Sequence, residues 1–61
     1  MNPLKILYVE DEPDIRMIGK QAMEFVGNFE VKDCPSGKDA IEATQHFTPD
    51  VIVLDVMMPG M

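Results

Sequence analysis

Acidic residues at two places in the chain carry its strongest chemical signal. Glu10 and Asp11 directly follow a short apolar run, and Asp55 directly follows a second one. If the two runs are neighbouring parallel strands, the three carboxylates meet beyond the carboxyl ends of the strands, where such sheets bind ligands. Carboxylates that close repel one another, and a divalent cation relieves that repulsion. Oxygen ligands with an open coordination sphere suit Mg²⁺.

A second interpretation of these acids needs no ligand. An Asp after a strand is often the N-cap of the following helix, and this alternative stays open for Asp11. Glu12 fits a solvated acid beside Pro13, a residue that is tolerated in a first helical turn. A carboxylate after each of the two apolar runs nevertheless favours a metal site.

The apolar pattern predicts the elements that must position the acids. Residues 4–9 and 51–54 are short apolar runs rich in β-branched side chains, typical of buried strands. Residues 29–34 alternate apolar and polar side chains, which is typical of an edge strand. Apolar residues recur at helical spacing in residues 14–26 and in a segment after residues 35–37, which predicts two helices. The order βαβαβ predicts an α/β fold with a parallel sheet, its first strand lying between the second and third.

The expected faces of the helices follow from the same spacing. In the first helix, Gly27 and Asn28 supply the stop, and polar side chains such as Arg16 and Lys20 should lie mostly opposite the core. Ser36 and Asp39 resemble a capping box at the start of the second helix. The side chains expected to face the sheet are, in the first helix, Ile15, Ile18, Ala22, Phe25 and Val26, and in the second, Ala40, Ile41, Thr44 and Phe47.

Composition excludes several classes of function. The chain has 61 residues, enough for at most one domain, and a net charge of −6, which argues against direct binding of nucleic acid or an anionic membrane. Cys34 is the only cysteine, so no internal disulfide forms, and with His46 it is too small a set for a zinc cluster. We expect Cys34 to be buried and His46 exposed. No apolar run approaches the ~18 residues of a membrane span, and a reducing, cytoplasmic setting fits.

Three segments together resemble the receiver domain of bacterial response regulators, the CheY-like family. Residues 8–13 (YVEDEP) resemble the acidic pair after the family's first strand, and residues 35–40 (PSGKDA) the turn into its second helix. Residues 51–60 (VIVLDVMMPG) resemble its third strand, phosphoacceptor and following loop. The resemblance implies a flavodoxin-like, doubly wound parallel sheet with strand order 2-1-3, in which residues 1–61 form the N-terminal half of the domain.

The resemblance also implies a role for each acid. Asp55 would take a phosphoryl group from the phosphohistidine of a histidine kinase or a phosphotransfer protein. Asp11 and Asp55 would bind Mg²⁺ directly, with the backbone carbonyl of Met57 as a third ligand. Glu10 would act at the other position of the acidic pair, through a water molecule. A protein of this kind is not an enzyme beyond its own phosphorylation and dephosphorylation.

The family's domain has five strands and five helices, with a hydroxyl residue after the fourth strand and a Lys after the fifth. The chain ends after its third strand, and residues 51–54 are therefore expected to be an exposed apolar edge that promotes self-association. A half-receiver that dimerises or binds a partner without phosphotransfer is the alternative function. An enzyme of the haloacid-dehalogenase type would need a second Asp two residues after the nucleophile, and neither Asp11 nor Asp55 has one.

Overall fold

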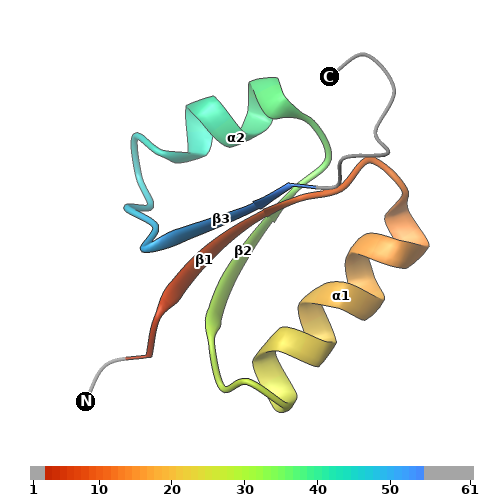
Figure 1. The fold of residues 1–61 in the computed structure, drawn as a ribbon. Helices are drawn as coiled ribbons and strands as arrows, with labels where there is room; N and C mark the ends of the chain where they lie inside the picture. Colours follow the sequence, from red (N-terminus) through yellow and green to blue (C-terminus); the bar gives the residue numbers. More distant parts are fainter. Residues whose placement is uncertain (1–2, 55–61) are drawn as a thin grey trace.

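The computed structural model describes residues 3–54 of the chain, which form a three-stranded sheet and two helices. The elements are β1 (Lys5–Val9), α1 (Pro13–Phe25), β2 (Glu30–Cys34), α2 (Gly37–Ala43) and β3 (Val51–Leu54). The strands are parallel and lie in the order β2-β1-β3, with the helices on opposite faces of the sheet (Figure 1). This confirms the predicted βαβαβ fold and strand order, with bounds that differ by one residue in β1 and β2.

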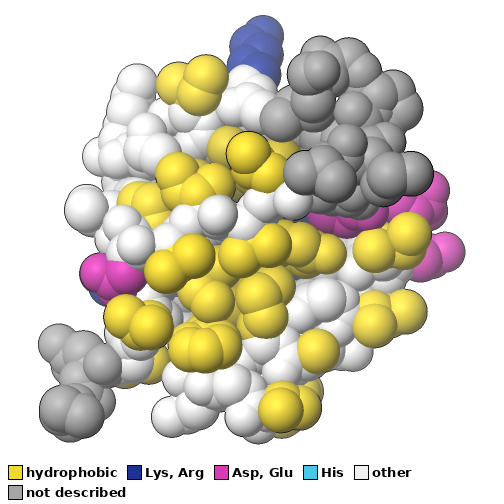
Figure 2. All heavy atoms as spheres, viewed as in Figure 1, with side chains coloured by type: hydrophobic (Ala, Val, Ile, Leu, Met, Phe, Trp, Pro, Cys, Tyr) yellow, Lys and Arg dark blue, Asp and Glu magenta, His cyan; other side chains and the backbone are white. Residues whose placement is uncertain are grey.

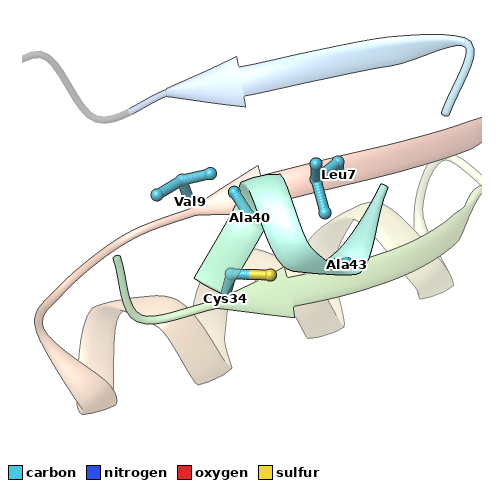
Figure 3. Packing of buried hydrophobic residues seen from close by; sticks show 5 residues of the cluster. All are labelled: Leu7, Val9, Cys34, Ala40 and Ala43. Carbon is cyan, nitrogen blue, oxygen red and sulfur yellow. The ribbon is translucent and has the colours of Figure 1, made fainter. Parts of the chain in front are cut away.

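The central strand β1 is buried because a helix covers each of its faces. Successive side chains of a strand point to opposite faces, so Leu7 and Val9 pack beneath α2 with Cys34 (Figure 3). Ile6 and Tyr8 pack on the α1 side. Covering on both faces explains why β1 is a nearly continuous apolar run in the sequence. It also buries Cys34, as predicted.

A pair of hydrogen bonds fixes where β3 starts against β1. The backbone N–H of Lys5 donates to the Asp50 carboxylate at 2.8 Å, and the Asp50 N–H donates to the Lys5 carbonyl at 2.7 Å. From this point the strands run in register as far as the pair Val9 and Leu54. The carboxyl ends of β1 and β3 are therefore level with each other.

Helix α1 turns the face opposite to the predicted one toward the sheet. The apolar stripe expected to be buried lies mostly in solvent: Phe25 is 83% exposed, and Ile15 and Ile18 are also exposed. The side chains that are half-buried on this helix include Arg16 and Lys20, which the sequence analysis placed on the opposite side. The prediction for the faces of α1 was wrong.

The observed orientation of α1 is explained by three residues on its sheet-facing side: Gly19, and the cations Arg16 and Lys20. A Cβ added at Gly19 would lie 2.5 Å from the Tyr8 hydroxyl oxygen, so any larger residue would force Tyr8 or the helix to shift. Arg16 and Lys20, on either side of Gly19, reach Asp33 of β2 at 3.4 and 3.9 Å. Their aliphatic stems can cover apolar surface while the charged ends pair. Close backbone approach and ion pairing thus orient α1.

Helix α2 begins as predicted and ends earlier. Its N-cap is Ser36, whose hydroxyl oxygen accepts from the Asp39 N–H at 3.2 Å and donates to the Asp39 carboxylate at 3.0 Å. This confirms the expected cap. The helix itself ends at Ala43, and Ile41, expected on its buried face, is 72% exposed. Thr44, predicted on the same face, is exposed as well, whereas Ala40 is buried as predicted, together with Ala43.

Phe47 reaches the core from outside the helix. The N–H groups of His46 and Phe47 both donate to the Ala43 carbonyl, at 3.0 and 2.8 Å. Such a tightened last turn satisfies carbonyls at a helix end, and it returns the Phe47 ring to the cluster that contains Ala43. The prediction that Phe47 packs against the core is confirmed, whereas its place within a longer helix is not.

Candidate functional site

Glu10 lies buried at the carboxyl end of the central strand. Its N–H donates to the Cys34 carbonyl at 3.0 Å, which extends the pairing of β1 with β2 by one residue. The residue is 1% exposed, the most buried acid among residues 3–54. Burial of a carboxyl group is costly unless it is paired or binds a cation, and such a position is typical of a binding or catalytic site rather than of a solvated surface.

Asp11 is exposed in the loop between β1 and α1. The N-cap of α1 is Glu12, and the Glu12 side chain makes no capping hydrogen bond. Asp11 is thus not the N-cap residue, whereas Glu12 is exposed to solvent, as the interpretation without a ligand expects. Figure 2 shows acidic side chains gathered at the right-hand side of the view, where Figure 1 places the turn from β1 into α1.

The register of β1 with β3 shows that the two strands end level with each other. Val9 pairs with Leu54, and the next residues in the sequence are Glu10 and Asp55. Asp55 and Met57 themselves lie outside the residues that the structure describes, so their predicted places as ligands are not tested. Within residues 3–54 no three His, Cys, Asp or Glu side chains come together as a metal site.

Arg16 anchors the acidic loop, and sequence reasoning missed this role. Its Nη1 donates to the Glu10 carbonyl oxygen at 3.0 Å, while its Nε lies 3.4 Å from the Asp33 carboxylate. The guanidinium is largely covered, with the side chain 20% exposed. The sequence signal was an Arg in the second turn of the helix that follows the acids, but assigning it to the solvent face hid its contact with them.

The remaining candidate residues have structural surroundings. His46 is exposed, as predicted. Burial raises the pKa of the Cys34 thiol above its ordinary value, with Lys32 opposing the shift. A thiol with a raised pKa is a poor nucleophile and a poor metal ligand at neutral pH. Cys34 therefore serves as a small apolar residue under α2.

Comparison with known protein families identifies the chain. The model of the response regulator receiver domain matches residues 6–61. The chain belongs to the response regulator receiver domain family. Its three parallel strands in the order β2-β1-β3 with two helices agree with the first part of the CheY-like fold of that family. The match confirms the resemblance to receiver domains that the sequence motifs indicated.

Among curated relatives, a nitrate/nitrite response regulator homologue of Haemophilus influenzae is 42% identical over 95% of this chain. The transcriptional regulatory protein TrcR of Mycobacterium tuberculosis is 36% identical over 98% of it. A protein-glutamate methylesterase/protein-glutamine glutaminase of Rhodospirillum rubrum is 40% identical over 93%. The chain spans only 28%, 23% and 15% of these three proteins, respectively. The similarity therefore concerns a receiver region shared by proteins whose names denote different activities.

No solved structure matched the chain. In the part of the chain that the structure describes, neither helix has the length and apolar character needed to cross a bilayer.

Proposed function

We propose that this receiver domain accepts a phosphoryl group on Asp55. The observation that carries the proposal is the register of the sheet: Val9 and Leu54 are paired at the carboxyl ends of parallel neighbours, and an acid follows each of them in the sequence. Membership of the receiver family supports the same role for Asp55. A histidine kinase or a phosphotransfer protein is the proposed donor.

We further propose that Glu10, Asp11 and Asp55, with the backbone carbonyl of Met57, hold a Mg²⁺ ion. The donor set fits this ion, because hard divalent cations prefer oxygen ligands and Mg²⁺ retains several water molecules. Within the described residues, a buried Glu10 beside an exposed Asp11 supplies one acid below the surface and one open to solvent. When bound, the ion would neutralise charge on the transferred oxygens.

The proposed chemistry is a single displacement. A carboxylate oxygen of Asp55 attacks the phosphorus of the donor's phosphohistidine, the phosphorus–nitrogen bond breaks, and the imidazole leaves with the electron pair of that bond. The product is an acyl phosphate on Asp55. It adds nearly two negative charges to a crowded acidic site, and such a change can bias a two-state surface. No other enzymatic activity is proposed for residues 1–61, which we interpret as the N-terminal part of one receiver domain.

The setting follows from charge and composition. A net charge of −6 disfavours direct contact with nucleic acid or an anionic membrane, so a regulator containing this domain would contact DNA through other parts. The single, buried Cys34 fits a reducing cytoplasmic location.

Phosphorylation by acetyl phosphate tests the proposed acceptor. We expect an intact-mass increase of one phosphoryl group when the 61-residue chain is incubated with acetyl phosphate and Mg²⁺, and loss of the adduct when EDTA replaces the ion. Asp55→Asn should abolish the adduct, because the amide is a far weaker nucleophile. Asp14→Asn, which changes an exposed acid in the first turn of α1, is the matched control and should still be phosphorylated. An adduct that persists in Asp55→Asn would place the acceptor elsewhere.

A second candidate function, self-association through β3, is supported by the exposure of that strand. Among the described residues β3 forms an edge of the sheet, and Val51, Ile52 and Leu54 are between 44% and 54% exposed. Figure 2 shows a broad hydrophobic band across the face where β3 lies. An apolar edge strand with backbone groups available for pairing invites another chain. We propose a second copy as the partner, related by a two-fold axis.

Sedimentation equilibrium at increasing concentration tests this candidate. Because each copy carries a charge of −6, repulsion opposes association, and the dimer should strengthen as salt rises. Ile52→Lys should weaken the dimer at least tenfold by placing a charge on the edge. Ile18→Lys, at an exposed position on α1 on the other face of the sheet, controls for the added charge alone. A mass of one chain at all concentrations and salt levels would rule out β3 as a self-association edge.

A further inference from the structure

We propose that Arg16 is a positioning residue for the metal site: it holds the acidic loop between β1 and α1 in the form that binds Mg²⁺. The inference rests on the proposed function, since it assigns a role toward the same site. It starts from one contact, the donation of Arg16 Nη1 to the Glu10 carbonyl oxygen at 3.0 Å. Arg16 thus holds the backbone of an acid of the site through its carbonyl oxygen.

A second contact of the guanidinium, with Asp33, holds the Arg16 side chain in place. Its Nε lies 3.4 Å from Asp33 Oδ2, so one planar group joins the end of β1 to β2. The backbone N–H of Arg16 also donates to the Glu12 carbonyl at 2.8 Å. The loop is therefore fastened through the carbonyls of both Glu10 and Glu12, on either side of Asp11.

Lys20 provides a natural comparison on the same helix face. Its Nζ lies 3.9 Å from Asp33 Oδ1 and 3.6 Å from Glu24 Oε2. It has the same charge as Arg16 and shares its carboxylate partner. Lys20 pairs with Asp33 and Glu24, and neither residue belongs to the acidic loop. A comparison of the two cations separates the effect of charge from the effect of anchoring.

The two possible roles of Arg16, as a nearby charge and as an anchor of the loop, predict opposite changes in Mg²⁺ affinity when Arg16 is replaced. If Arg16 acts only as a nearby positive charge, it repels Mg²⁺, and its removal should tighten binding. If it positions the loop, its removal should weaken binding, because groups that orient metal ligands typically contribute 10–100-fold to affinity. A Lys keeps the charge but cannot present two N–H groups in the fixed fork of a guanidinium. Arg16→Lys is therefore the decisive variant.

The test is a Mg²⁺ titration of the 61-residue chain, followed by the amide signals of Glu10 and Asp11 in ¹H–¹⁵N NMR spectra. We expect Arg16→Lys and Arg16→Gln both to bind Mg²⁺ about tenfold more weakly than the wild type. Lys20→Gln should bind as the wild type or slightly more tightly. Unchanged affinity in Arg16→Lys, or tighter binding in Arg16→Gln, would overturn the inference. A wild type that does not bind Mg²⁺ would overturn the proposed metal site itself, so the two failures are distinguishable.

A second measurement, made without metal, tests the anchor directly. Amide hydrogen exchange at Glu10, whose N–H donates to the Cys34 carbonyl, should accelerate at least tenfold in both Arg16 variants and remain unchanged in Lys20→Gln. Urea unfolding of the same proteins corrects for any global loss of stability. Exchange that rises equally at all amides would show a general destabilisation and would contradict the positioning role.

Discussion

At the scale of single residues, the shape of the site depends on how closely α1 approaches the sheet. Gly19 faces Tyr8 of the central strand, and a Cβ at position 19 would also come within 2.9 Å of the Tyr8 ring. The same face of α1 carries Arg16, which contacts the Glu10 carbonyl. The absence of a side chain at position 19 therefore brings the Arg16 anchor within reach of the acidic loop.

Gly19→Ala tests this close approach. Ala favours a helix interior over Gly by about 1 kcal/mol, but overpacking against Tyr8 should cost about 1–3 kcal/mol. We expect a net loss in the free energy of unfolding of about 1 kcal/mol, measured by urea denaturation. The loss should be partly recovered in a Tyr8→Phe background, which removes the nearest oxygen. A more stable Gly19→Ala protein would mean that α1 does not pack this closely.

At the scale of elements, apolar spacing predicted the strands and their order and part of the buried face of α2, but not the face that α1 turns to the sheet. The segments that form β1 and β3 were predicted as strands because both are short apolar runs rich in β-branched residues. Right-handed crossovers then leave few possible strand orders. The faces of α1 could not be deduced in this way. Its apolar stripe is real, but the side turned to the sheet is decided by Gly19 and by ion pairs with Asp33, and a partner on another strand is not visible in local spacing.

Some residues of the candidate site were proposed from the sequence, and one contact of the site was not. Glu10 and Asp11 were predicted because an acid after a buried strand has a clear sequence signature, and β1 does end in front of Glu10. Arg16 was missed, because its role depends on the geometry of the loop and on Asp33. As metal ligands, Glu10 and Asp11 stay predictions, and so do Asp55 and Met57, which lie outside the described residues. Sequence patterns thus predicted the acids and missed the cation that holds their loop.

Two phenylalanines test the observed orientation of α1. Phe25, in the apolar stripe, is exposed, whereas Phe29 is partly buried against Ile6, Tyr8 and Val31. In urea denaturation, Phe25→Ala should change the free energy of unfolding by no more than about 0.5 kcal/mol. Phe29→Ala should cost about 2 kcal/mol, less than a fully buried ring. Equal losses in the two variants would show that the stripe of α1 is buried after all.

At the scale of the whole molecule, excess negative charge and exposed apolar surface have different consequences. The charge of −6 keeps copies apart and draws cations, while exposed side chains on α1 and β3 favour contact with another surface. Binding of a divalent ion by the acidic residues would reduce the repulsion between copies. We therefore expect Mg²⁺ to stabilise the fold and to favour association together, through linkage to the native state.

The central claim is that the acids after Val9 and Leu54 share one metal ion. Mn²⁺ takes the same oxygen ligands as Mg²⁺, and it broadens the NMR signals of nearby nuclei. The most direct measurement is a titration of ¹⁵N-labelled chain with trace Mn²⁺, with Mg²⁺ added afterwards as competitor. The amide signals of Glu10, Asp11 and Asp55 should broaden together before all others and recover with Mg²⁺. Broadening at only one of the two strand ends, or at neither, would contradict a shared metal site.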